Sequence, residues 1–194
     1  MTTFTTKTGM ALDDFLRLQD EQPFELINGE RIPKLPNVAG HSDANHRLFG
    51  LLFVFLNANP LGTVLMETTF ILPDHDDSNW VEGSRIPDLM FYSADRLAAY
   101  KAQTPDWKDR PYALVPDLVV EIVSPNDSYS KVDEKVDAYL ADGVRLIWVL
   151  DPQRRKATIH APDLELPIPL KLGATLDGGD VLPGFSVPLA ALFG

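Results

Sequence analysis

The sequence has no cysteine among its 194 residues. Without thiols the chain cannot form disulfides, thiolate zinc sites or iron–sulfur clusters, and it has no Cys nucleophile. Its longest apolar stretch, residues 48–56, is far shorter than the roughly 20 residues that a transmembrane helix needs. The N-terminus also lacks the apolar core of a signal peptide. We therefore expect a cytoplasmic protein that does not span or anchor to a membrane.

Positive charge is scarce as well. The chain has 17 Lys and Arg against 28 Asp and Glu, a formal net charge of −11 at pH 7. This balance argues against a protein that coats nucleic acid non-specifically, because such binding comes from neutralised phosphates. It does not exclude an enzyme that binds nucleic acid on one local basic surface. The length predicts one domain over residues 1–194, with a loose arm at residues 1–10.

Hydrophobic periodicity predicts alternating helices and strands. Around Asn28-Gly29, a dipeptide that tolerates positive φ, the segment 24–35 predicts a hairpin. Ser42 or Asp43 is available as N-cap of one helix, and Ser130 with Asp133 has capping-box spacing in another. The predicted helices are 11–20, 41–57, 94–101 and 130–143; the predicted strands are 62–73, 86–92, 117–123, 144–151 and 156–161, with loops at 74–84 and 103–116. The pattern predicts an α/β core, with helices on a mixed sheet and short strands after residue 161.

Two acids stand inside otherwise apolar predicted strands. Glu121 shares a strand face with Val119 and Val123, and Asp88 is flanked by apolar neighbours in the same way. A buried carboxylate must be paired, protonated or bound to a metal. One alternative is a set of structural ion pairs, such as Glu121 with Lys135. Two carboxylates on neighbouring strands, followed by a lysine-bearing helix, favour a metal site.

These residues form part of an ordered set of segments that resembles a known family. The segments are PD at 87–88, PDLVVEIVSPND at 116–127, K-x3-Y-x3-GV at 135–144 and IWVLDP at 147–152, together with FELINGE at 24–30, the His41 helix start and LPGFSVPLAALF at 182–193. The set resembles the Uma-two (Uma2) family of proposed restriction endonucleases in the PD-(D/E)xK nuclease superfamily. The resemblance implies a restriction-endonuclease-like core, a mixed β-sheet flanked by helices, with an N-terminal hairpin and a C-terminal β extension.

The resemblance also implies a catalytic site. Asp88 and Glu121 would bind Mg²⁺ or Mn²⁺ through carboxylate oxygens, and the reaction would be hydrolysis of nucleic-acid phosphodiester bonds. The sequence departs from the superfamily pattern at Val123, where the pattern has lysine. Lys135, on the following helix, is the matching position in the family, and Lys131 is its competitor one helical turn earlier.

Two further residues are candidates through the same resemblance. Glu25 in the hairpin matches an auxiliary acid, although a hairpin acid often faces solvent. His41 matches a histidine at the start of the core helix, where it could contact phosphate or assist proton transfer. Arg154, Arg155 and Lys156 form the one compact basic cluster, which fits either a phosphate contact or an ordinary charged turn.

The expected function is therefore a divalent-metal-dependent endonuclease. The expected partner is nucleic acid, with DNA preferred over RNA, and homodimerisation would supply two sites for two strands. The alternative is a catalytically silent module that binds nucleic acid or protein on the same scaffold. Val123 and the net charge favour the alternative, and so would a direct Glu121–Lys135 salt bridge without room for a metal.

Overall fold

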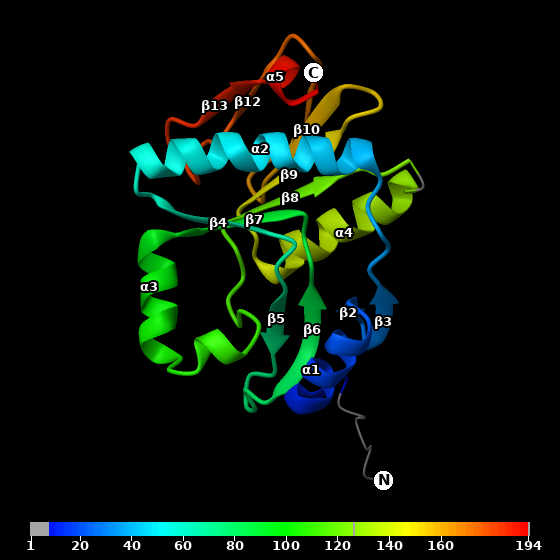
Figure 1. Cartoon of the computed structure of the whole chain (residues 1–194), viewed down its shortest axis with the longest axis vertical. Helices are drawn as coiled ribbons and strands as arrows, with labels where there is room; N and C mark the ends of the chain where they lie inside the picture. The colour runs from blue at the N-terminus through cyan, green and yellow to red at the C-terminus, as the bar shows by residue number, and fades with distance from the viewer. Residues whose placement is uncertain (1–7, 126, 194) are drawn as a thin grey trace. The chain divides into compact units, whose positions relative to one another are not determined.

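A computed structural model describes residues 8–125 and 127–193, so most of the arm expected at residues 1–10 lies outside the described residues. The chain divides into two compact units (Figure 1). Unit 1 contains the residues up to Leu35 together with Thr69–Ile86 and Asp106–Val115, and unit 2 contains Pro36–Thr68, Pro87–Pro105 and the chain from Pro116 onwards. That the two units act as one domain stays a prediction.

Unit 1 is a small antiparallel sheet with one helix. The strand order is β1-β6-β2-β3, and β5 pairs with β6 off this path. The elements are β1 (Met10–Ala11), α1 (Leu12–Glu21), β2 (Phe24–Ile27), β3 (Glu30–Pro33), β5 (Phe70–Pro73), β6 (Trp80–Arg85) and the 3-10 helix η1 (Trp107–Asp109). Phe15 of α1 is fully buried in a core with Leu26, Ile71 and Val81.

The predicted hairpin is confirmed. Strands β2 and β3 pair from Phe24↔Pro33 to Ile27↔Glu30, and the turn residues Asn28 and Gly29 have φ values of 52° and 82°. Both turn positions therefore need the left-handed conformation that Asn and Gly adopt most readily.

Unit 2 contains a six-stranded mixed sheet in the order β11-β10-β9-β8-β7-β4. Strands β8 and β9 are parallel, and the other neighbours are antiparallel. The sheet strands are β4 (Gly62–Met66), β7 (Leu89–Ser93), β8 (Leu118–Ile122), β9 (Leu146–Asp151), β10 (Lys156–His160) and β11 (Ile168–Leu170). A smaller sheet and four helices complete the unit: β12 (Thr175–Asp177), β13 (Ser186–Pro188), α2 (Ala39–Ala58), α3 (Ala94–Gln103), α4 (Tyr129–Asp142) and α5 (Leu189–Phe193).

The two faces of the six-stranded sheet carry different helices. Leu48 and Leu52 of α2 pack in one core with Val120 and Ile122 of β8. Because successive strand residues point to opposite faces, Glu121 points the other way, where α4 lies. Figure 1 shows α2 and α4 beside this sheet. The predicted α/β class, a mixed sheet flanked by helices, is confirmed.

Three local predictions were wrong. The segment 62–73 is not one strand but two, β4 and β5, because Glu67 between them has a φ of 44° and Thr68 Oγ1 turns back to donate to Met66 O. The predicted loop 74–84 contains most of β6, whose polar residues pair with β2 and β5.

The third error concerns the helix caps. Helix α2 begins earlier than expected, after Val38, and no side chain caps it, so Ser42 and Asp43 lie inside the helix. Helix α4 is capped by Ser128, whose Oγ accepts from the Lys131 N–H, rather than by Ser130. Gly143 ends α4 in the left-handed conformation, with a φ of 97°.

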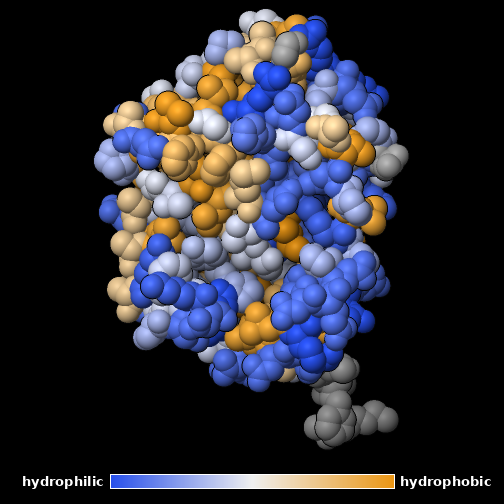
Figure 2. Space-filling model, viewed as in Figure 1, coloured by the Kyte–Doolittle hydropathy of each residue, from blue (hydrophilic) through white to orange (hydrophobic). Residues whose placement is uncertain are grey.

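Among the described residues, no helix combines the length and apolar character that crossing a membrane requires. Helix α2 is the richest in exposed apolar side chains, with Phe53 and Val54 52% and 69% exposed. Figure 2 shows hydrophobic residues on the surface of this part of unit 2.

Candidate active site

Glu121 stands near the end of the central strand β8. Glu121 is only 7% exposed. Both carboxylate oxygens accept hydrogen bonds: Oε2 from Lys135 Nζ at 3.0 Å and Oε1 from the Tyr139 hydroxyl at 2.5 Å. A buried carboxylate in an apolar strand is thus satisfied by two donors, as burial requires.

Helix α4 supplies both donors from one face. Lys135 and Tyr139 are four residues apart, so their side chains lie one above the other. The buried Val132 and Val136 share this face and hold it against the sheet. The Lys135 side chain remains 26% exposed, while Tyr139 is fully buried.

Asp88 lies immediately before β7 and is 2% exposed. Its Oδ2 accepts the backbone N–H of Ile122 at 2.7 Å and lies 3.0 Å from His41 Nε2. Since Ile122 directly follows Glu121, the first bond ties Asp88 to the same end of β8. The two predicted acids therefore meet at one end of the neighbouring strands β7 and β8 in unit 2.

His41 is in the first turns of α2 and is 4% exposed. An ionised carboxylate can only accept, so Nε2 carries the proton that is donated to Asp88. Nδ1 is buried, and among the described residues it has no hydrogen-bond partner. His41 therefore holds Asp88 in position through Nε2.

Lys131, the competing lysine, and Glu25, the auxiliary acid, are the two remaining candidates. Lys131 is exposed on α4, and its backbone N–H meets the Ser128 cap. Glu25 belongs to β2 of unit 1, where it is 4% exposed and its Oε1 accepts the Ile86 N–H at 2.9 Å. The solvent-facing alternative for Glu25 is therefore wrong, while its role as an auxiliary acid stays a prediction. Unit 2 thus brings together Asp88, Glu121, Lys135 and His41.

The comparison with protein families shows which family the chain belongs to. The Uma2 model, described as "Putative restriction endonuclease", matches residues 12–190. The chain belongs to the Uma2 family. The resemblance of its segments to that family is confirmed, and membership places this Uma2 protein among nucleases.

One of the solved structures found supports the fold. A "putative nuclease belonging to DUF820" from Anabaena variabilis ATCC 29413 is 20% identical, with a TM-score of 0.75 over 95% of this chain and 97% of that chain. A cryo-EM structure of the DrdV–DNA complex is 13% identical over 79% of this chain and 95% of that chain, with a TM-score of 0.31 that is too low to show a shared fold. The search of curated proteins found no match.

The carboxylate oxygens of this Uma2 protein are the type of ligand that a hard cation prefers. Mg²⁺ is usually held by one or two carboxylates, with waters and substrate phosphates completing its shell. Asp88 and Glu121 provide two carboxylates, whose oxygens are ligands of the kind that Mg²⁺ prefers. Within residues 8–125 and 127–193, no group of three or more His, Cys, Asp or Glu residues is placed to hold a metal. Any metal here would therefore need oxygens from water or substrate.

Tyr139 was not among the predicted site residues. The spacing K-x3-Y at 135–139 was the signal available, because it places both side chains on one helical face. What the sequence alone did not reveal was that this face turns toward Glu121.

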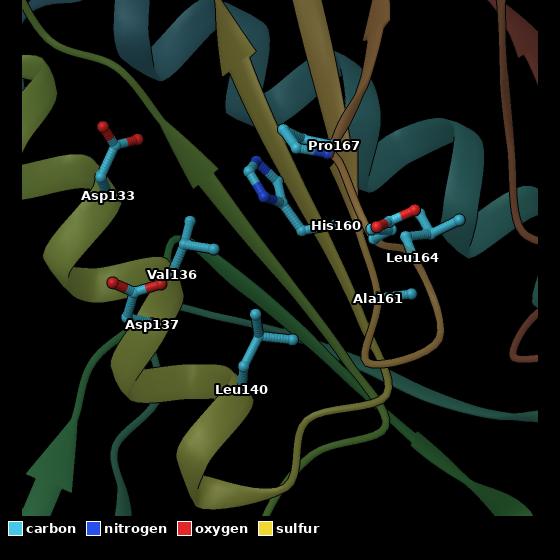
Figure 3. Close-up of a pocket in the computed structure, with 9 residues that line it drawn as sticks. Asp133, Val136, Asp137, Leu140, His160, Ala161, Leu164 and Pro167 are labelled. Carbon is cyan, nitrogen blue, oxygen red and sulfur yellow. The ribbon is translucent and has the colours of Figure 1, made fainter.

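A second feature of unit 2 is a pocket of about 390 Å³ beside α4. Figure 3 shows Asp133, Asp137 and Leu140 of α4 on one side and His160 and Leu164 on the other. Burial lowers the pKa of His160 from its ordinary value of 6.5, while the charges of Asp133 and Asp137 oppose that shift. None of these residues was predicted to be catalytic.

Proposed function

We propose that this Uma2 protein is a divalent-metal-dependent endonuclease that hydrolyses phosphodiester bonds in nucleic acid, and DNA is the substrate we expect. The observation that supports it most is the bond from the Ile122 N–H to Asp88 Oδ2. This bond places one buried acid beside the strand end that carries the other, with Lys135 on Glu121. Two carboxylates and the Lys135 ammonium at one end of strands β7 and β8 match the needs of phosphodiester hydrolysis.

Asp88 and Glu121 would hold Mg²⁺ or Mn²⁺. When bound, the cation polarises a phosphoryl oxygen and lowers the pKa of a water molecule. Lys135 has a partly exposed ammonium, fixed by Glu121, that can stabilise the negative charge developing on the phosphate. The lysine acts from α4 because Val123 occupies the usual lysine position on the strand.

His41 and Glu25 would support the site. His41 Nε2–H donates to Asp88 and so fixes the orientation of this carboxylate, in the way that partners of metal ligands usually do. Glu25 fixes the backbone at Ile86, two residues before Asp88 in the chain, and its role as auxiliary acid is part of the proposal.

The test is cleavage of supercoiled plasmid DNA with Mg²⁺ or Mn²⁺, with single-stranded RNA in a parallel reaction. Wild type should nick or linearise the plasmid only with the cation, and linear product would favour a homodimer with two sites. Asp88→Asn and Glu121→Gln should abolish cleavage while the protein still folds. Retained cleavage in both variants would refute the proposal.

Asp117→Asn is the matched control. Asp117 is also a fully buried acid, at the opposite end of β8, and it pairs with Arg96 at 2.8 Å and Arg145 at 3.4 Å. Breaking a buried pair is destabilising, so this variant should lose stability and keep its cleavage activity when folded.

A second candidate function is a catalytically silent module that binds nucleic acid or protein. The observation that favours it is the direct Lys135–Glu121 ion pair, together with the Tyr139 hydroxyl on the other Glu121 oxygen. In that case the buried acids would serve only structure. Purified protein would then bind oligonucleotides or a protein partner without cleaving nucleic acid. It would bind neither Mg²⁺ nor Mn²⁺.

A further inference from the structure

Two basic side chains converge on one exposed aromatic ring in unit 2. The guanidinium carbon of Arg154 lies 4.5 Å from the centroid of the Tyr129 ring, and Lys156 Nζ lies 5.3 Å from it. The Tyr129 residue is 42% exposed and the Arg154 side chain 57%. We call Tyr129, Arg154 and Lys156 the basic edge. In a chain of net charge −11, it is a local positive surface.

Asp151, the last residue of β9, organises this surface. Its Oδ2 accepts the Tyr129 hydroxyl at 2.5 Å and Arg154 Nη1 at 3.4 Å, and its Oδ1 accepts the Arg154 backbone N–H at 2.9 Å. One carboxylate thus holds the ring and the guanidinium together. Asp151 contributes one negative charge against two positive ones, and the N-terminus of α4 at Tyr129 adds partial positive charge.

The strand register places the basic edge near the candidate active site. In the parallel pair β8–β9, Glu121 lies opposite Val149, two residues before Asp151. With strands about 4.8 Å apart and about 3.3 Å per residue, the Cα atoms of Asp151 and Glu121 are about 8 Å apart. Asp151, which holds the basic edge, therefore lies near the same end of the sheet as Glu121.

On the basis of the proposed nuclease function, we infer that the basic edge binds the sugar–phosphate backbone next to the phosphate that is cleaved. Arg154 and Lys156 contact phosphate oxygens, for which guanidinium and ammonium groups are suited. Tyr129 and Asp151 keep both cations in place before the substrate arrives. Such contacts fix the register of the strand and carry no sequence information.

The experiment measures binding by fluorescence anisotropy, over a range of salt concentrations and with EDTA present to prevent cleavage. The probes are end-labelled duplex DNA, single-stranded DNA and single-stranded RNA of several sequences, which separate the possible sources of the backbone. The full chain is compared with Arg154→Gln/Lys156→Gln. The matched control is Arg17→Gln/Lys171→Gln, which removes the same charge from two exposed positions.

The double variant should bind more weakly, by a similar factor for every sequence. Each phosphate contact contributes about −0.9 to the salt slope on duplex DNA and about −0.7 on single strands. Between about 50 and 200 mM salt, wild type should therefore lose about 12-fold more duplex affinity than the double variant. Lys156→Gln alone keeps the Arg154–Asp151 pair and should show half of the change in slope.

The outcomes separate the two proposals. Equal affinity and equal salt slope in wild type and the double variant would overturn the basic edge as a backbone site, and so would an equal loss in the control. If that wild type still cleaves DNA with Mg²⁺, only this inference fails. Absence of both binding and cleavage in wild type would overturn the inference and the proposed nuclease together.

Discussion

Lys135 Nζ lies 3.0 Å from Glu121 Oε2, although 14 residues separate the two in the chain. The strand position that usually carries the lysine is occupied by Val123, which is 9% exposed. Helix α4 therefore delivers a cation to the acid from outside the strand. The chemistry proposed for the site depends on this helix and on the register that its packing fixes.

Lys135 should be needed for cleavage and Lys131 should not. Lys135→Gln keeps a hydrogen-bond donor for Glu121 but removes the positive charge, and loss of one such electrostatic stabiliser costs about 10²–10³ in kcat. Lys131→Gln removes the same charge from an exposed position on the same helix. Single-turnover cleavage rates of the two variants provide the comparison. Equal rates would show that the Lys135–Glu121 pair is only structural.

Tyr139→Phe should destabilise the protein, although the substitution leaves no large cavity. The ring stays in its buried place, while Glu121 loses the hydroxyl that donates to Oε1. A hydrogen bond to a charged group contributes about 1.5–3 kcal/mol, so the free energy of unfolding in urea should fall by about that amount. Unchanged stability would mean that the Tyr139–Glu121 bond contributes nothing net to the fold.

His41→Gln should weaken binding of Mn²⁺. His41 donates to Asp88, and loss of a group that orients a metal ligand typically costs about 10–100-fold in metal affinity or activity. His46→Gln is the control, because His46 is exposed on the same helix. Calorimetric titration with Mn²⁺ should show the loss in the first variant alone. The same affinity in both would remove His41 from the site.

The His160 pocket should make stability depend on pH. Burial lowers the pKa of His160 in the folded chain below 6.5, so the unfolded chain binds more protons in the window between the folded and unfolded pKa values. Stability therefore rises with pH through that window and falls as the pH drops below about 6.5. His160→Gln should reduce the loss of unfolding free energy between about pH 7.5 and pH 5.5. An equal loss in wild type and variant would contradict this.

Much of the fold could be predicted because local patterns were strong. The near-continuous apolar run of β8 and the helical spacing of α4 both hold, and Asn28-Gly29 specifies its own turn. The errors fell where strand pairing overrides composition. Residues 80–85 include Glu82, Gly83 and Ser84, yet they form β6 because β2 and β5 pair with them.

The candidate site could likewise be predicted only where the local sequence pattern was informative. Acids in apolar predicted strands were enough to single out Asp88 and Glu121, because burial of a lone charge is costly. Their partners could not be derived from local pattern, since His41 lies 47 residues from Asp88 and Tyr139 lies 18 from Glu121. Such contacts depend on how α2 and α4 pack on the sheet.

The central claim is that Asp88 and Glu121 form a site for a divalent cation. The most direct test is isothermal titration of the full chain with Mn²⁺, with and without an added DNA duplex whose phosphates can complete the metal shell, beside Asp88→Asn. We predict binding to wild type that is lost in the variant. Binding of equal affinity in both, or no binding to wild type under either condition, would contradict the claim.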